Sequence, residues 1–132
     1  MATETNETTQ ERQERLKRLY YNKKHEKKIT RPFEELYEWY EQQEKKCCYC
    51  GITEAEISQL FDAGHLIAKH PTRGRHLEID RKKAERYYDD FDNLTLACYW
   101  CNNAKTDTFT YEEFMGIGKA IAQIWKTRLK EV

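Results

Sequence analysis

Residues 92–105 read DNLTLACYWCNNAK, and this stretch decides the fold. Leu94–Ala97 alternates between apolar and polar side chains, as a short strand does. Cys98 and Cys101 follow with two residues between them, and Lys105 comes about one helical turn after Asn102. The stretch therefore predicts a strand, a tight cysteine knuckle and the start of a helix.

A second cysteine pair has the same spacing, at Cys47 and Cys50. Two such knuckles can present four thiolates to one ion in the closed tetrahedral arrangement that structural zinc prefers. Disulfides are not expected, because residues 1–10 are polar and acidic and do not resemble a secretory signal. The fifth cysteine, Cys48, is interpreted as a spectator. If it replaced Cys47 as a zinc ligand, only one residue would separate it from Cys50.

The composition explains why a zinc site would be useful. The chain has 132 residues, 39% of them hydrophobic and 35% charged, which fits one domain with a thin core. Metal binding would add its free energy to that of folding.

No apolar run approaches the ~18 residues of a membrane span. The 23 basic and 23 acidic residues cancel, which argues against a protein that coats nucleic acid over its whole surface.

The charges are unevenly placed along the chain. Nine of residues 12–31 are basic, and so are seven of residues 69–86. Each stretch could be a solvated helix face or a surface that contacts phosphates, and both interpretations stay open.

Hydrophobic spacing and capping signals divide the chain into three segments. We expect a disordered tail over residues 1–10, a basic segment over 11–31 that is helical to about Lys24, and one domain over 32–132. The elements expected in this domain are a helix from Pro32 with an aromatic stripe in the core, a helix capped by Thr53 and Glu56, a loop over 64–74, strands over 76–80 and 94–97, and a long C-terminal helix capped by Thr110 and Glu113.

Two parts of the sequence together resemble the HNH endonucleases. Residues 76–81 read HLEIDR, which puts an acidic residue at a strand end, and an Asn-Leu turn at Asn93 leads into the strand and knuckle quoted above. In that family, two strands and a helix hold one divalent cation, and zinc knuckles support the motif in many members. The resemblance implies an α+β fold: a small zinc-stapled ββα-metal domain over residues 32–132, with flanking helices and a four-cysteine zinc site.

Within the family, the likeness extends to a rare-cutting restriction endonuclease and covers roughly Asn22 to Lys126. His25 falls where that enzyme has an active-site histidine. The enzyme has an additional N-terminal zinc knuckle, whereas no cysteine precedes Cys47 here, so its target sequence is not transferred. The other shared positions are Cys47, residues 50–52, Asp80, Arg81, Tyr88, Asn93, residues 96–98, Cys101, Asn102, Lys105, Gly118, Ala120, Ile121 and Trp125.

The resemblance also implies roles for three polar residues. Asp80 and Asn102 would bind Mg²⁺ or Mn²⁺ through oxygen atoms, the ligands that hard cations prefer. Asn93 would hold the loop between the strands through backbone hydrogen bonds. Taken singly, Asp80 could be a surface acid and Asn102 a helix cap, but their combination in this sequence favours the metal site.

Arg81 stands where the usual motif has a histidine that serves as general base. A guanidinium stays protonated, so Arg81 is expected to grip the scissile phosphate and not to accept a proton. By resemblance, Tyr88 and His25 are the candidates that activate water, with Tyr87 as the alternative if the alignment shifts by one residue. A free tyrosine ionises only near pH ~10, so the cation or Arg81 would have to assist.

Five further polar residues are weaker candidates. His76 shares a face of the predicted strand with Glu78 and Asp80 and could lie near the cation. Glu78 could support Asp80, and Lys105 could contact DNA or be solvated. His65 and His70 are less favoured than His76.

The sequence is therefore interpreted as a divalent-metal-dependent HNH endonuclease that hydrolyses phosphodiester bonds in double-stranded DNA. Restriction-type cleavage by a homodimer is expected, and a nicking phage or mobile-element enzyme would carry the same motif. The expected location is the cytoplasm, for a bacterial or phage-encoded protein without a membrane span. The alternative, favoured by Arg81, is a catalytically inactive, zinc-stabilised nucleic-acid-binding module. A thiol redox protein is disfavoured, because no thioredoxin-like pattern surrounds the cysteine pairs.

Overall fold

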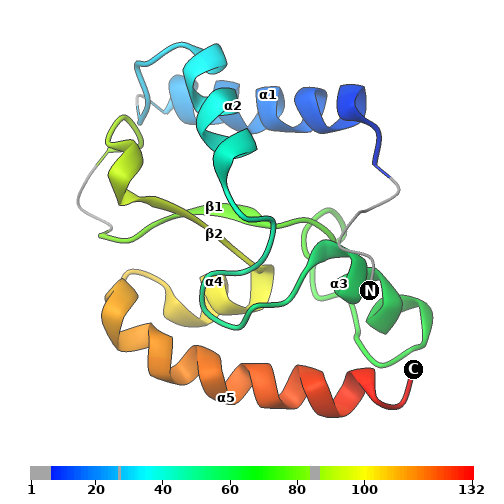
Figure 1. Ribbon diagram of the computed structural model, residues 1–132. Helices are drawn as coiled ribbons and strands as arrows, with labels where there is room; N and C mark the ends of the chain where they lie inside the picture. Colours follow the sequence, from blue (N-terminus) through cyan, green and yellow to red (C-terminus); the bar gives the residue numbers. More distant parts are fainter. Residues whose placement is uncertain (1–6, 27, 84–86) are drawn as a thin grey trace.

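The computed structural model describes residues 7–26, 28–83 and 87–132, which form an α+β architecture (Figure 1). The α+β class predicted from the sequence is confirmed. The elements, in chain order, are helices α1 (Thr9–His25), α2 (Phe33–Gln42) and α3 (Glu54–Asp62), strand β1 (Glu78–Arg81), the 3-10 helix η1 (Phe91–Asn93), strand β2 (Leu94–Ala97), and helices α4 (Tyr99–Lys105) and α5 (Tyr111–Leu129).

An antiparallel strand pair forms the middle layer of the molecule. Asp80 of β1 lies opposite Thr95 of β2, and Arg81 lies opposite Leu94. Helices α1 and α2 lie on one side of the pair, and α4 and α5 lie on the other (Figure 1). Successive side chains of a strand point to opposite faces, yet both Ile79 and Asp80 are buried, because both faces are covered.

Threonine capping boxes begin three of the helices. Those at Thr53 and Thr110 agree with the sequence prediction. The third, at Thr8, starts α1 inside the segment expected to be a disordered tail. Residues 1–6 of that segment lie outside the described residues, but the expectation is wrong for residues 7–10: Glu7 accepts hydrogen bonds of 2.8 and 3.1 Å from Arg15. The polar composition of this stretch conceals the capping signal.

The aromatic stripe of α2 belongs to the core, as predicted. Phe33, Leu36 and Tyr40 are buried, and Phe33 packs edge-on against Tyr20 of α1 at 5.7 Å between ring centroids. Pro32 precedes the helix as its N-cap residue. Within the described residues, none of the helices is long and apolar enough to cross a membrane.

Strand β1 and helix α5 differ from the expected pattern in detail. The strand begins at Glu78 and not at His76, because the backbone N–H of Leu77 donates to the Glu54 carboxylate at 2.8 Å. On α5, Ile117 and Ile124 are 41% and 48% exposed, whereas Phe114, Gly118 and Trp125 are the buried positions.

Candidate active site

The four paired cysteines meet in one buried cluster. The sulfurs of Cys47, Cys50, Cys98 and Cys101 all lie within 4.8 Å of one another, and Cys50 Sγ is 3.7 Å from Cys98 Sγ. Four thiolates around zinc, each at about 2.3 Å from the metal, lie about 3.8 Å apart in a tetrahedron. The cluster therefore fits a structural zinc ion, as the paired spacing predicted.

Backbone hydrogen bonds fix the first knuckle against the sheet. Cys48 N donates to Leu96 O of β2 at 2.9 Å, and Gly51 N donates to Cys47 O at 2.9 Å. The turn needs a positive φ of 77° at Gly51, a conformation that glycine adopts without a steric penalty. The zinc centre is thus joined directly to the strand pair.

The position of its sulfur separates the spare cysteine from the four ligands, because Cys48 does not belong to the group of sulfurs that lie within 4.8 Å of one another. Burial raises the pKa of Cys48 to about 12, so this side chain stays a thiol at neutral pH. The geometry of the cluster therefore agrees with the interpretation of Cys48 as a spectator.

Four of the residues singled out in the sequence line one small cavity beside the strand pair. Its volume is about 180 Å³, and its lining comprises Ile79, Asp80, Arg81, Tyr88, Asn102, Thr106 and Asp107. Asp80 and Arg81 come from β1, Asn102 from α4, and Tyr88 from the segment before η1. The cavity therefore combines a carboxylate, an amide, a guanidinium and a phenol.

Two side chains contact the same carboxylate oxygen of Asp80. Tyr49 Oη donates to Asp80 Oδ2 at 2.9 Å, and Lys105 Nζ lies 3.5 Å from the same oxygen. Burial raises the pKa of Asp80, and this effect is opposed by the charge of Lys105 and the hydrogen bond from Tyr49. Lys105 is only 2% exposed, so the expectation that it contacts DNA or is solvated is wrong.

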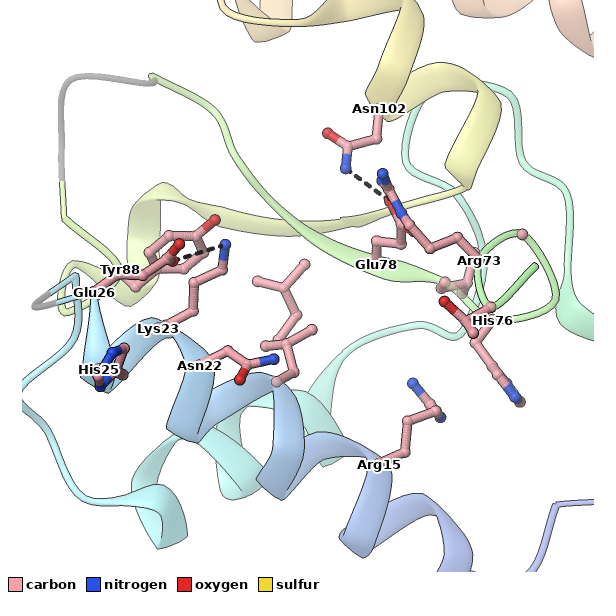
Figure 2. Close-up of a pocket in the computed structure, with 15 residues that line it drawn as sticks. Arg15, Asn22, Lys23, His25, Glu26, Arg73, His76, Glu78, Tyr88 and Asn102 are labelled. Atoms are coloured by element: carbon pink, nitrogen blue, oxygen red, sulfur yellow. Dashed lines mark hydrogen bonds and ion pairs between the residues drawn. The ribbon is translucent and has the colours of Figure 1, made fainter. Parts of the chain in front are cut away.

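Asn102 lies at the edge of a larger groove between α1 and β1, with a volume of about 670 Å³ (Figure 2). Its amide nitrogen donates to Glu78 Oε1 at 2.9 Å. The amide oxygen is the atom that remains for a cation. A carboxylate at Asp80 and an amide oxygen at Asn102 are a donor set that suits Mg²⁺ or Mn²⁺.

Arg81 and Tyr88 lie against each other. The Arg81 guanidinium is 5.0 Å from the centroid of the Tyr88 ring, and Lys23 Nζ of α1 is 5.1 Å from the same centroid. Tyr88 is buried, whereas Tyr87, the alternative in the alignment, is 69% exposed. Both cations lie over the face of the ring, where the electrons of an aromatic ring attract positive charge.

His25 is the last residue of α1 and lines the larger groove on the same side as Tyr88 (Figure 2). Asp89 holds the following loop in place: it accepts hydrogen bonds from Thr30 N at 2.8 Å, Thr30 Oγ1 at 2.6 Å and Arg31 N at 3.0 Å. The segment that carries Tyr88 is in this way attached to the loop between α1 and α2.

Asn93 is buried at the start of β2 and pairs with the backbone of Lys83. Its Oδ1 accepts from Lys83 N and its Nδ2 donates to Lys83 O, each at 2.9 Å. These bonds close the connection between β1 and β2 next to residues 84–86, which lie outside the described part of the chain.

His76 lies away from the small cavity. Its ring nitrogens are 3.4 Å from Glu54 Oε1 and 3.8 Å from Glu7 Oε2. The expectation that it shares a strand face with Asp80 is wrong, because β1 begins two residues later. His65 and His70 do not line either of the two cavities described above.

Several residues of this site have no role that the sequence predicts. Tyr49 looks like an ordinary core aromatic within a zinc knuckle, and Asp107 like a loop acid. The salt bridge of Arg73 to Glu78, with contacts of 2.8 and 2.6 Å, joins residues five positions apart. Of these contacts, only the salt bridge between Arg73 and Glu78 could have been predicted from the sequence. The two residues have opposite charges and lie on either side of the strand start predicted at His76.

An antiparallel strand pair, a helix behind it and a four-cysteine centre define a ββα-metal protein, and the chain belongs to the HNH endonuclease family. No family model and no curated protein matches the sequence. Among solved structures, the chain is similar to the rare-cutting HNH restriction endonuclease PacI, whose structure is described for its perturbation of DNA.

The similarity to PacI is substantial over most of both chains. The sequences are 30% identical, the TM-score is 0.68, and the match covers 85% of this chain and 77% of PacI. The resemblance inferred from the sequence is confirmed, and the likeness supports a nuclease-type function.

Proposed function

We propose that this chain is a divalent-metal-dependent endonuclease that hydrolyses phosphodiester bonds in double-stranded DNA. The observation that carries the proposal is the shared cavity of Asp80, Arg81, Tyr88 and Asn102. These four side chains supply two oxygen ligands, a phosphate clamp and a phenol within one space of about 180 Å³.

Asp80 and Asn102 would hold Mg²⁺ or Mn²⁺. The bound cation would act as a Lewis acid towards the scissile phosphate and the leaving oxygen. Hydrogen bonds and an ion pair within the protein hold the side chains of Asp80 and Asn102 in fixed orientations. Mg²⁺ demands near-ideal geometry, and ligands that are already oriented lower the entropic cost of binding it.

Arg81 would grip a non-bridging phosphate oxygen and stabilise the charge that develops there. The permanent charge of this side chain prevents it from serving as the base. Tyr88, beside Arg81 and Lys23, is the proposed group that accepts the proton of the attacking water, with His25 at the groove rim as the second group in that task. Asn93 has a structural role in the strand connection.

The basic side of the chain provides the proposed DNA surface. Helix α1 carries Lys23, Lys24 and other cations next to the groove that contains Asn102. One cavity of this kind cuts one strand, so restriction-type cleavage of both strands requires a second active site, most simply in a homodimer. We further propose a bacterial or phage origin and a cytoplasmic site of action.

The second candidate function is a zinc-stabilised nucleic-acid-binding module without catalysis. The presence of Arg81 in place of a histidine base favours this alternative. Such a module would bind DNA in the absence of Mg²⁺ and would be unaffected by loss of Asp80. The nuclease would require the cation and would lose cleavage, but not binding, in Asp80→Ala and Asn102→Ala.

The deciding experiment uses zinc-loaded protein and several supercoiled plasmids, with and without Mg²⁺ or Mn²⁺. Discrete linear fragments that require the cation and are absent with Asp80→Ala support the restriction-type nuclease. Open circles alone indicate a nickase. Intact plasmids under all conditions, together with a gel shift, favour the binding module.

A further inference from the structure

The hydroxyl group of Tyr49 lies between the zinc centre and the cavity. Tyr49 belongs to the first cysteine knuckle but cannot bind zinc through its phenol, which instead donates to Asp80 Oδ2 at 2.9 Å. Both side chains are buried, with 5% of Tyr49 and 8% of Asp80 exposed. A buried hydrogen bond to a carboxylate is among the stronger kinds in proteins.

The position of this hydroxyl is set by the zinc centre and by α5. The Tyr49 ring packs edge-on against Phe114 of α5 at 5.1 Å between centroids. Helix α5 approaches the backbone of Tyr49 closely at Gly118, where a Cβ atom would come within 2.6 Å of the Tyr49 carbonyl carbon. Helix α5 therefore contacts both the backbone and the ring of Tyr49, and this packing restricts the side chain.

Lys105 reinforces the same geometry from the helix that carries Asn102. Its ammonium group lies 3.5 Å from Asp80 Oδ2 and donates to Arg81 O at 3.2 Å. Tyr49 and Lys105 therefore both engage one oxygen of Asp80. An ionised carboxylate has a second oxygen with its own lone pairs, and Asp80 also lines the small cavity.

We infer that Tyr49 is a positioning residue for the catalytic cation: its hydroxyl holds one oxygen of Asp80 and directs the other into the cavity shared with Asn102. The zinc centre thereby sets the affinity of a second, chemically different metal site. This inference rests on the proposed function only in that Asp80 is taken as a ligand of Mg²⁺ or Mn²⁺.

The test compares Tyr49→Phe with the wild type, both loaded with zinc. Loss of such a ligand-orienting partner weakens metal binding by about 10–100-fold. We expect that change in the Mn²⁺ dissociation constant, measured by electron paramagnetic resonance without DNA, and a matching rise in the Mg²⁺ concentration that half-activates cleavage. Cleavage at saturating Mg²⁺ should recover, and the zinc content should stay the same.

Tyr111→Phe is the matched control. Its ring packs against Tyr49 at 5.5 Å between centroids, so this variant removes a hydroxyl from the same aromatic cluster without removing the bond to Asp80. Mn²⁺ affinity should be unchanged in this control. Unchanged Mn²⁺ affinity in zinc-loaded Tyr49→Phe would overturn the inference.

A measurement on the unmutated protein covers the case in which Tyr49→Phe loses zinc. The buried, hydrogen-bonded hydroxyl proton of Tyr49 should give a downfield NMR signal that shifts when Mg²⁺ is added. A signal that does not move while Mg²⁺ binds would also overturn the inference. A wild-type protein that binds Mn²⁺ in this way but cuts no DNA would contradict the proposed function and leave the role of Tyr49 supported.

Discussion

The amide nitrogen of Asn102 donates to Glu78 Oε1 at 2.9 Å, and this bond determines which end of the amide is available for a cation. An ionised carboxylate can only accept, so the nitrogen must face Glu78 and the oxygen must face elsewhere. Arg73 in turn holds the Glu78 carboxylate with contacts of 2.8 and 2.6 Å (Figure 2). Asn102 is therefore oriented by a pair of charged residues that do not themselves line the small cavity.

Replacement of Glu78 by Gln should lower the affinity for the catalytic cation. A glutamine can turn either amide atom towards Asn102 and leaves Arg73 without its charge partner, so the orientation of the Asn102 oxygen is lost. We expect cleavage at limiting Mg²⁺ to fall by about 10–100-fold. Cleavage rates across a Mg²⁺ series provide the measurement.

Glu112→Gln is the control for this substitution, because Glu112 is an exposed acid in the first turn of α5. It makes the same chemical change away from the cavity and should leave the Mg²⁺ dependence unaltered. If Glu78→Gln gave the same Mg²⁺ curve as this control, Asn102 would need no orienting partner.

Removal of zinc should unfold the domain. The four-cysteine cluster joins the knuckle at Cys47 and Cys50 to the start of α4, and structural zinc sites contribute about 10 kcal/mol in small domains. Chelation, or Cys50→Ser, should abolish the cooperative thermal transition in circular dichroism. Cys48→Ser should retain one zinc per chain and a near-normal transition, and a loss of zinc from that variant would make Cys48 a ligand.

Local signals predicted the elements that depend on neighbours in the sequence. Strand β2 matches its predicted bounds, because an alternating pattern is followed directly by the knuckle that ends it. The capping boxes at Thr53 and Thr110 and the spacing within the cysteine pairs are equally local. The capping box at Thr8 is also local, but its polar surroundings conceal it.

The contacts that shape the cavity are not local, so no pattern in the sequence predicts them. Tyr49 and Asp80 are 31 positions apart, and their hydrogen bond depends on how the knuckle packs against the sheet. Lysines are mostly exposed in proteins, so the burial of Lys105 becomes understandable only from its ion pair with Asp80. The start of β1 likewise depends on Glu54 of another helix, which captures the N–H of Leu77.

Glu54 should make the fold sensitive to acid. Burial acts to raise the pKa of Glu54, but hydrogen bonds from His76 and Leu77 outweigh it, and the net pKa is lowered. A lowered pKa contributes stability that is present above the unfolded value of about 4.3 and is lost as the pH falls through the folded value. Urea unfolding of wild type and Glu54→Gln at several pH values should show a difference in stability that shrinks on acidification.

The comparison is limited to pH values at which both proteins keep their zinc, which is checked by measuring the metal content, because loss of the metal is expected to unfold the domain. With zinc retained, a difference that stays constant as the pH falls from neutral to the unfolded pKa of about 4.3 would mean that the charge of Glu54 does not stabilise the fold.

Two glycines on α5 should respond in opposite directions to replacement by alanine. At Gly118 a new Cβ would come within 2.6 Å of the carbonyl carbon and 2.8 Å of the Cβ of Tyr49, so the helix must move away from the knuckle. Overpacking of this kind costs about 1–3 kcal/mol. At Gly116 no atom of the described residues outside the helix backbone lies within 4 Å of the position that a Cβ would take, and alanine should stabilise the helix by up to about 1 kcal/mol. Urea unfolding of the zinc-loaded variants measures both effects.

The same two substitutions should differ in their effect on Mn²⁺ binding. Because Tyr49 holds Asp80, Gly118→Ala should weaken Mn²⁺ binding, whereas Gly116→Ala should leave it unchanged. Equal effects of the two substitutions would contradict the close packing of α5 on Tyr49.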